Sequence, residues 1–564
     1  MRHKVDWRAL SIAAFGMIAA LPATSASAES TSEEIRLLKA RLKQLEAKVG
    51  QQERAAKVEK ARPGHAAPGV VVAGLPGPDH IYFKGLEVTP GGFFAAETVY
   101  RDHWMGADIN TPYQNIPYGF LSSAHTSEWR ASARPSRPAI MIKADLDKQT
   151  HVMAYGEVDF LGAAQTANSN GSNSYNLRLR QAYGNVDFDE WGLHAAAGQM
   201  WSLVTMNSVG IRPDTSLQPP VIDHQYLPGY NWARQAGFRI TKDINKQFWA
   251  SFAVESGATT IAAPGGAFAP TPGLAVTNGI FGPVAGVYPT VLSAPAGGGL
   301  FFNGNNYSYN RLPDFIGKLA WDGQLIDRKI HVEGFGILRD ATSRVYGGNH
   351  SQWGGGGGGG VVVQLMPKLL DFQFSGMIGN GIGRYGSGGL ADATWTLTGA
   401  PKFLFQRTVM AGLTLHATPQ TDVYAFAGGE FSSGASQVAR VGNTLFASGY
   451  GNPLYNNLGC GVEPGTVAAA NGVASAGVLG AFGGFNFQCV GQTKALRQLT
   501  GGVWHTFYNG PAGKIRGGIQ YSYTVRNGFD GYGGAPRGVE NMVFTSLRYY
   551  PFDGTMPTPV LAKY

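Results

Sequence analysis

The chain has 564 residues, of which 15% are charged, 12% are aromatic and 80 are glycine. This composition is too apolar and too aromatic for a disordered chain, and the length exceeds what one soluble core usually supports. The formal net charge of +8 does not gather into a basic patch with stacking aromatics, so we expect no nucleic-acid partner. After residue 28 no apolar run reaches about 18 residues, and the sequence therefore offers no membrane-spanning helix.

Residues 1–28 have the pattern of a secretory signal peptide. Arg2, Lys4 and Arg8 form a basic start, an apolar stretch covers 10–21, and small residues at 26–28 fit a cleavage site. Cleavage after Ala28 would place the mature chain outside the cytoplasm.

Residues 29–60 contain a short coiled-coil helix. Apolar residues recur at alternating spacings of three and four, which is the heptad a/d pattern. They are Ile35, Leu38, Leu42, Leu45 and Val49. Isoleucine at a and leucine at d favours two strands, whereas the segment Arg41–Glu46 resembles the motif of short trimeric coiled coils, and both oligomers stay open. A lone helix of this length is marginal in water, so we expect it to form where the chains are already held together.

Residues 61–90 are rich in proline and glycine and predict a linker without regular structure. We expect the first strand to begin at Phe93.

The remainder of the chain predicts strands. In Lys514–Arg526 apolar or small residues alternate with polar ones, which is the period of a strand with one dry and one wet face. The same pattern, with varying clarity, predicts sixteen strands. They lie near 93–100, 136–145, 151–160, 175–188, 193–200, 233–241, 247–255, 312–321, 329–339, 357–366, 369–378, 406–417, 422–431, 498–508, 514–526 and 539–552.

Short and long connections alternate between these strands. The short ones are rich in Asp, Asn, Gly and Pro, the residues of tight turns. They are 145–150, 189–192, 243–246, 322–328, 367–368, 418–422 and 509–513. A bacterial outer-membrane barrel has short periplasmic turns and long external loops. We therefore predict an all-β transmembrane barrel of 16 antiparallel strands over 91–552, preceded by the coiled-coil helix and followed by a C-terminal extension, 553–564.

Three local features carry further expectations. The alternation in 175–188 changes parity after Arg180, which suggests a bulge or a misplaced strand edge. The seven glycines Gly354–Gly360 predict a flexible loop that runs into a strand. Cys460 and Cys489 lie in one irregular stretch and can form a disulfide in an oxidising compartment, or remain two inert thiols.

Several short motifs resemble the trimeric porins of Gram-negative bacteria, most closely the DcaP-like porins with an N-terminal coiled coil and more distantly the phosphate-selective porins. The motifs are Ser136-Arg137, Tyr155–Phe160, Leu177–Gly184, Ala197–Trp201 and Ser546–Phe552. The last resembles the aromatic assembly signal of such barrels, although here the chain continues to Tyr564. The resemblance implies a homotrimer in the outer membrane, with the coiled coil in the periplasm. The implied partners are membrane lipid, lipopolysaccharide, the barrel-assembly machinery and small polar solutes.

In these porins the loop after the fifth strand narrows the pore. By resemblance, Asp214 and Asp223 of the corresponding loop here, about 201–232, form the acidic side of a constriction. We expect a basic face across the lumen, because opposed rows of charge select solutes by charge and dipole. Its candidates are Arg130, Arg134, Lys143, Arg178, Arg180, Lys514, Arg516 and Arg548.

No pattern of catalytic or metal-ligating residues stands out, so we expect neither an enzyme nor a cofactor or metal. The sequence predicts a porin for passive diffusion of small hydrophilic solutes. The alternatives are a channel selective for small anions such as dicarboxylates or phosphate, and, from another class, a structural tether or adhesin of the cell envelope. A soluble secreted β-protein is the last alternative.

Overall fold

The computed structural model describes residues 81–162, 174–223, 226–262, 310–345, 348–396, 399–441, 444–461, 463, 489–510 and 512–552. The expected signal peptide, the coiled-coil positions Ile35 to Val49, the linker up to residue 80 and the extension after residue 552 lie outside these residues.

The described chain is almost entirely β-structure. Short 3-10 helices interrupt its loops: η1 Tyr113–Asn115, η2 Ser122–His125, η3 Asp189–Trp191, η4 Pro213–Thr215, η6 Gly383–Tyr385 and η7 Leu458–Gly461. The strands are β1 Ile81–Phe83, β2 Leu86–Arg101, β3 Glu128–Ser132, β4 Arg137–Asp145, β5 Thr150–Asp159, β6 Arg178–Phe188, β7 Leu193–Trp201, β8 Arg234–Ile244, β9 Phe248–Glu255, β10 Asp314–Leu325, β11 Arg328–Val345, β12 Gly348–Met366, β13 Leu370–Asn380, β14 Ala393–Trp395, β15 Pro401–Phe403, β16 Phe405–Thr418, β17 Thr421–Ser432, β18 Ala435–Val441, β19 Thr444–Tyr450, β20 Thr493–Gly510, β21 Gly513–Gly528 and β22 Arg537–Tyr550.

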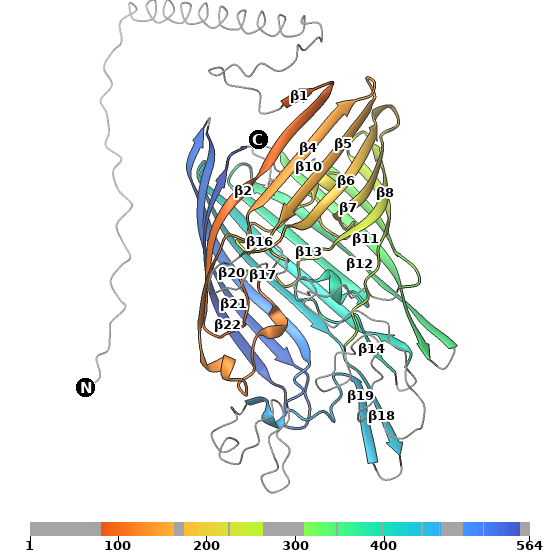
Figure 1. Cartoon of the computed structure of the whole chain (residues 1–564). Coiled ribbons are helices and arrows are strands. Elements are labelled where there is room, and N and C mark those ends of the chain that lie inside the picture. The colour runs from red at the N-terminus through yellow and green to blue at the C-terminus, as the bar shows by residue number, and fades with distance from the viewer. Residues whose placement is uncertain are drawn as a thin grey trace, which may run out of the picture. The chain divides into compact units, whose positions relative to one another are not determined.

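Sixteen of these strand positions form one closed antiparallel barrel (Figure 1). Each strand pairs with its neighbour in the chain, and β2 pairs with β22 to close the ring. β3 and β4 together occupy the second position, because both pair with β2 in succession. β1 is a three-residue extension hydrogen-bonded to the start of β2. The barrel predicted from the strand pattern is confirmed.

The barrel is apolar outside and polar inside, the reverse of a water-soluble protein. In β21, Ile519 and Tyr521 are 55% and 50% exposed, whereas Gln520 and Ser522 between them are 1% and 0% exposed. In β13, the outward Phe374 and Ile378 likewise alternate with buried polar residues. An exposed apolar band around a closed sheet matches the lipid-facing surface of a membrane barrel, where no backbone edge is left unpaired.

The seven short connections lie at the predicted places, although β10 continues to Leu325, past its predicted end at residue 321. The connection between β10 and β11 consists of Ile326 and Asp327, both with positive φ (51° and 59°). Two successive residues of positive φ are the signature of the two-residue turn whose twist matches that of the hairpin. All seven lie at one end of the barrel, and β18 and β19 extend beyond the other end (Figure 1).

Three histidines near the short turns connect neighbouring strands. His194 contacts Asp187 of β6 and Asp243 of β8, at 2.5 and 3.0 Å. His331 and His416 likewise lie between two carboxylates each, at 2.7–3.1 Å. An imidazole that contacts acceptors through both ring nitrogens holds adjacent strands together in the way a cross-strand pair does.

Two boundaries differ from the sequence expectation. The first barrel strand begins at Leu86 and not at Phe93, and β1 precedes it, so residues 81–83 and 86–90 of the expected linker 61–90 already belong to the sheet. The sequence signal is weak there because Gly91 and Gly92 interrupt the alternation.

The seven glycines Gly354–Gly360 are not a loop. All seven lie inside β12 and pair with β11, and Gly355–Gly360 also pair with β13. A side chain on Gly358 would meet the Phe335 ring at 2.6 Å, one on Gly354 would meet Phe403 at 2.5 Å, and one on Gly360 would meet Met206 at 2.9 Å. Glycine is required because bulky groups of a neighbouring strand and of the loops occupy the space beside β12.

The bulge expected beside Arg180 is present. Glu157 of β5 pairs with Gln181 and the next residue, Val158, pairs with Leu179, so Arg180 is the extra residue. Both Arg180 and Gln181 are buried as a result. The bulge therefore turns a second polar side chain into the barrel.

Cys460 and Cys489 are joined by a disulfide with 4.7 Å between their Cα atoms. Within the described residues, no helix has the length and hydropathy needed to cross a membrane.

Candidate functional site

The loop between β7 and β8, residues 202–233, runs through the barrel interior. Near its start, Lys318 Nζ of β10 donates to the carbonyl of Thr205 at 2.8 Å, and Asn207 N donates to Glu333 Oε2 of β11 at 3.0 Å. All these strand side chains are buried and face inward.

The second half of this loop contacts the opposite wall. Trp504 Nε1 of β20 donates to the carbonyl of Pro220 at 2.8 Å. Ile222 N donates to Gln520 Oε1 of β21 at 2.6 Å, and Arg548 Nη2 of β22 donates to the carbonyl of Ile222 at 2.9 Å. Since β10 and β22 are eight positions apart in a ring of sixteen, the loop crosses the interior from one side to the other.

The two expected acidic residues of this loop lie in different environments. Asp214, with its side chain 33% exposed, accepts from Arg212 Nε at 3.1 Å, and Arg212 also pairs with Asp187 of β6. Asp223 is only 3% exposed and accepts from Thr111 Oγ1 (2.9 Å) and Gln520 Nε2 (3.1 Å). Burial raises the pKa of Asp223 to about 6, although the two hydrogen bonds act in the opposite direction.

Two further loops, which the sequence did not indicate, join the first. Loop 102–127 follows β2, and its Tyr113 hydroxyl contacts both the carbonyl of Tyr226 and Gln498 of β20. Loop 381–404 follows β13, and its Tyr385 carbonyl accepts from Trp232 N at 2.7 Å. The side chain of Gln114 connects these two loops by donating to the carbonyl of Gly388 at 3.1 Å.

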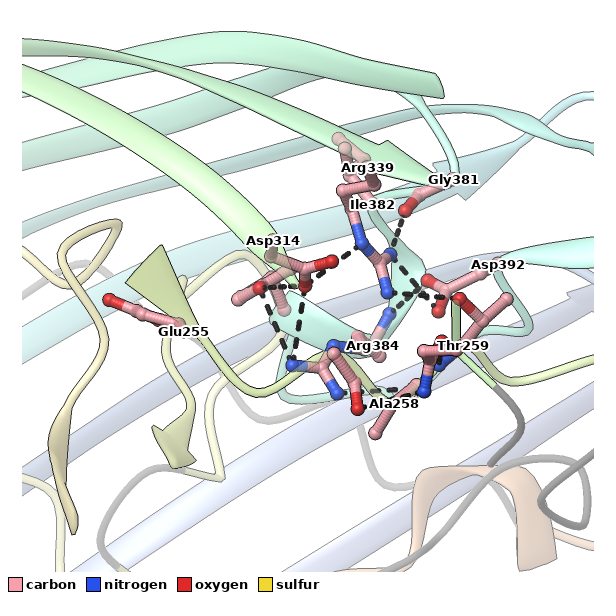
Figure 2. Close-up of polar contacts among 12 residues, drawn as sticks. Glu255, Ala258, Thr259, Asp314, Arg339, Gly381, Ile382, Arg384 and Asp392 are labelled. Atoms are coloured by element: carbon pink, nitrogen blue, oxygen red, sulfur yellow. Dashed lines mark hydrogen bonds and ion pairs between the residues drawn. The ribbon is translucent and has the colours of Figure 1, made fainter. Parts of the chain in front are cut away.

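An ion-pair network anchors loop 381–404 to the wall (Figure 2). Arg339 of β11, which is 0% exposed, donates through Nε to Asp314 Oδ2 of β10 at 3.1 Å. Its Nη1 lies 3.1 Å from Asp392 Oδ2 of the loop and also contacts the Gly381 carbonyl. Arg384 reaches Asp314 from the loop side at 3.6 Å. Each buried charge thus has an opposite partner, as buried charges require.

Glu430 of β17 connects two loops. Its Oε1 accepts from Gly229 N of loop 202–233 and from Gly388 N of loop 381–404, both at 2.9 Å. Side chains on Gly386 or Gly388 would meet its Oε2 at 2.3 and 2.8 Å. The glycines therefore permit the backbone to approach a fully buried carboxylate, and one side chain holds both loops.

Most of the expected basic residues are paired with carboxylates of the wall. Arg178 and Arg180 both contact Asp159, each at 2.8 Å, and Arg180 also contacts Glu157. Arg548 pairs with Glu97 at 2.6 Å, Arg134 pairs with Asp108 at 2.9 Å, and Arg516 pairs with Asp422. Arg130 is 3.7 Å from Glu128, Lys514 lies over the Tyr550 ring, and Lys143 is exposed on β4.

Basic charge nevertheless exceeds acidic charge in one part of the wall. Arg137 of β4, together with Arg178 and Arg180 of β6, faces Glu157 and Asp159 of β5. Arg137 is 5% exposed and contacts Glu157 only at 3.9 Å. Three donors in this cluster are buried and make no hydrogen bond to the protein: Arg137 Nε, Arg178 Nη1 and Arg180 Nη2. We call these five residues the arginine cluster.

Sequence reasoning missed the inward apolar residues that receive the loops. Phe426, Trp504, Met542 and Phe544 occupy inward positions and are 0–3% exposed. They pack in one cluster with Val221, Ile222 and Leu227 of loop 202–233. Aromatic residues at inward positions of a wide barrel are a signal that a loop packs there, because water would otherwise solvate that face.

No protein-family model matches the chain, and no curated protein matches it. Among solved structures, it is similar to the outer membrane channel DcaP of Acinetobacter baumannii, with 14% identity, 83% of this chain and 97% of that chain covered, and a TM-score of 0.52. The chain also matches Salmonella typhi OmpF in complex with daunomycin, with 8% identity, 84% of this chain and 99% of that chain covered, and a TM-score of 0.42.

The fold is therefore that of an outer-membrane channel: a closed sixteen-stranded antiparallel barrel. The resemblance to DcaP-like porins expected from the sequence is confirmed at the level of the fold.

Proposed function

We propose that this chain is a porin of a Gram-negative outer membrane, through which small hydrophilic solutes diffuse passively. The observation that supports this most directly is the inverted barrel, with polar side chains inside and an exposed apolar band outside. A ring of sixteen strands is wide enough to hold water. Loop 202–233 would narrow the pore together with loops 102–127 and 381–404, with Asp214 accessible to solutes and Asp223 buried where the loop contacts Thr111 and Gln520.

Conductance tests this proposal. The full mature chain is purified in detergent, inserted into a planar bilayer and recorded in a salt gradient. Stepwise openings in groups of three are expected for a homotrimer. Folded protein that never conducts would contradict the proposal and favour the tether or adhesin.

A selective channel for small anions is the second candidate, and the arginine cluster favours it. Three arginines face two carboxylates, which leaves an excess of positive charge and three unused donors. Guanidinium groups bind carboxylate and phosphate oxygens well, because their donors form a planar fork.

The reversal potential in a salt gradient separates the two candidates. If the wild-type channel is anion-selective, the reversal potential of Arg137→Gln should shift toward cation preference. Arg328→Gln, which removes the same charge from an exposed position at a short turn, is the matched control and should leave the selectivity unchanged. Equal selectivity in the wild-type chain and in Arg137→Gln would refute the anion-selective candidate.

The proposal includes export by residues 1–28 and a coiled coil of residues 29–60 in the periplasm that supports the trimer. Mass spectrometry of the mature chain should find an N-terminus at Glu29. Chemical cross-linking should give fewer trimers after deletion of 33–49, with the conductance of the remaining barrels unchanged. Lost envelope integrity in the same deletion would assign the segment a tethering role instead.

A further inference from the structure

Three side chains meet where the first and last barrel strands join, at the end of the barrel that carries the long loops. Asp102 and His103 directly follow β2, and Glu540 belongs to β22. One ligand-type atom from each lies within 4.8 Å of the others, and no other group of three or more acidic, histidine or cysteine residues in the described part of the chain does this.

The arrangement of the atoms suggests a shared centre. His103 Nδ1 lies 2.9 Å from Asp102 Oδ1 and 3.5 Å from Glu540 Oε2, yet it makes no hydrogen bond. Lone-pair atoms that point at a common centre, and not at one another, produce such contacts. Ligand bonds of about 2.1 Å in a tetrahedral zinc site imply ligand-to-ligand distances of about 3.4 Å.

Glu540 is the second, independent observation. Its side chain is 0% exposed, and its Oε2 is buried without a hydrogen bond. Its Oε1 accepts from His103 N at 3.1 Å, which aims the other oxygen toward Asp102 and the imidazole. Arg101, which precedes Asp102, is directed away from Glu540 because its Nη1 pairs with Glu128 at 2.7 Å. A buried carboxylate oxygen without a hydrogen-bond donor is costly, and a bound cation would satisfy it.

The surroundings hold the other two ligands in place and leave access from solvent. Asn541 N donates to Asp102 Oδ1 at 2.8 Å, so the backbone of β22 positions a ligand contributed by β2. Asp102 and His103 are 33% and 25% exposed at their side chains. An ion could therefore enter and keep a water molecule as its fourth ligand.

We propose that Asp102, His103 and Glu540 bind one divalent transition-metal ion, with zinc as the best match. Two carboxylates supply a charge of −2, and the imidazole nitrogen favours zinc over magnesium or calcium, which prefer oxygen ligands. Because two ligands directly follow β2 and the third belongs to β22, the complete site exists only in the closed barrel. Metal binding therefore stabilises closure and links the two strands beyond their last hydrogen-bonded pair.

Zinc binding to the untagged full chain in detergent tests this. The protein is stripped with a chelator, dialysed against ZnCl2 and analysed for metal content. One zinc per chain is expected, together with an unfolding temperature that rises with zinc concentration and does not respond to MgCl2. No retained zinc, or an unfolding temperature that is indifferent to zinc, would overturn the proposal.

Variants separate a metal site from a shared proton. His103→Ala should not retain the zinc, and its affinity for zinc should fall at least tenfold. His125 lies in a long loop, 3.6 Å from the exposed Glu463, and His125→Ala should bind zinc as the wild type does. Glu540→Gln keeps the shape and should also lose affinity. If Glu540→Gln binds zinc normally, Glu540 merely carries a proton and the assignment is wrong. Cobalt absorption bands of a tetrahedral site, present in the wild type and absent in His103→Ala, give a readout independent of stability.

Discussion

Single buried charges decide how the interior loops are held. Arg339 balances Asp314 on the wall and Asp392 on loop 381–404, and none of the three is more than 1% exposed. The attraction between two opposite buried charges offsets the cost of removing both from water. Removing one partner therefore leaves the other as an uncompensated buried charge. The stability of the barrel therefore depends far more on the identity of the residue at 339 than on the number of surface ion pairs.

Arg339→Met should destabilise the barrel by about 3–5 kcal/mol, because two buried carboxylates lose their cation. Urea unfolding in detergent, followed by tryptophan fluorescence, measures the change. Arg344→Met is the matched control on the same strand, since Arg344 is exposed and its Nη1 donates to exposed Asn349 Oδ1 at 2.9 Å. It should cost less than about 1 kcal/mol. Equal losses in both variants would show that the network around Arg339 is not what holds the loop.

Asp223 makes the docking of loop 202–233 depend on pH. Its pKa in the folded chain is about 6, above the ordinary 3.8, because burial disfavours the charged form. The folded state therefore binds the proton more tightly than the unfolded state. The resulting stability is complete below pH 3.8 and is lost as the pH rises through 6, by up to about 3 kcal/mol.

Limited proteolysis of the loop should accordingly be faster at pH 8 than at pH 5 in the wild type. Asp223→Asn keeps the shape without the charge and should give the same rate at both pH values. Asp214→Asn, in the same loop but partly exposed, should retain the wild-type response. A pH response that survives in Asp223→Asn would assign it to another group.

At the scale of the element, β12 shows what the interior demands of a strand. The glycines from 354 to 360 carry no side chain on either face, yet all of them pair with β11 and those from 355 to 360 also pair with β13. Pattern-based reasoning needs side chains to detect alternation, so a strand of glycine leaves no signal. The reason for the composition lies in Phe335, Phe403 and Met206, which come from elsewhere in the chain.

Gly358→Ala should destabilise the barrel by about 1–3 kcal/mol, because its new Cβ would lie 2.5 Å from the carbonyl oxygen of Gly376 and 2.6 Å from the Phe335 ring. Gly357→Ala, the neighbouring position, would meet nothing closer than the Phe335 carbonyl oxygen at 3.4 Å and should change stability by less than about 0.5 kcal/mol. The temperature of the heat-induced shift in gel mobility measures the stability of both variants. If the two variants behave alike, space beside β12 is not the constraint.

At the scale of the whole molecule, Glu430 joins the wall to two loops that are far apart in the sequence. Loops 202–233 and 381–404 should therefore respond together when it is removed. The two backbone donors would lose their shared acceptor inside the barrel, at a cost of about 1–3 kcal/mol for each buried unsatisfied group.

Glu430→Ala should raise the single-channel conductance and its fluctuations and should expose both loops to protease. Glu430→Gln keeps an oxygen at the position of Oε1 and should behave close to the wild type. Conductance and cleavage in Glu430→Ala that match the wild type would mean that the loops are held independently of this residue.

The sequence by itself determined the barrel. Alternation, the turn residues and the regular order of short and long connections are local signals, and they sufficed for sixteen strands, for the ends of the short turns and for the bulge at Arg180. The resemblance to porins, and not a local pattern, pointed to the loop at about 201–232 as the candidate narrowing element.

Only the tertiary structure decided what fills the interior. The pairing of Arg178 and Arg180 with Asp159, the burial of Asp223, the parts played by loops 102–127 and 381–404, and the meeting of Asp102 with Glu540 depend on which strands face each other across a closed ring. Residues about 440 positions apart become neighbours only when β2 pairs with β22, and no local pattern encodes that contact. Outward residues face lipid and are therefore apolar at every second position. The identity of each inward residue depends instead on the particular side chain or loop that it contacts.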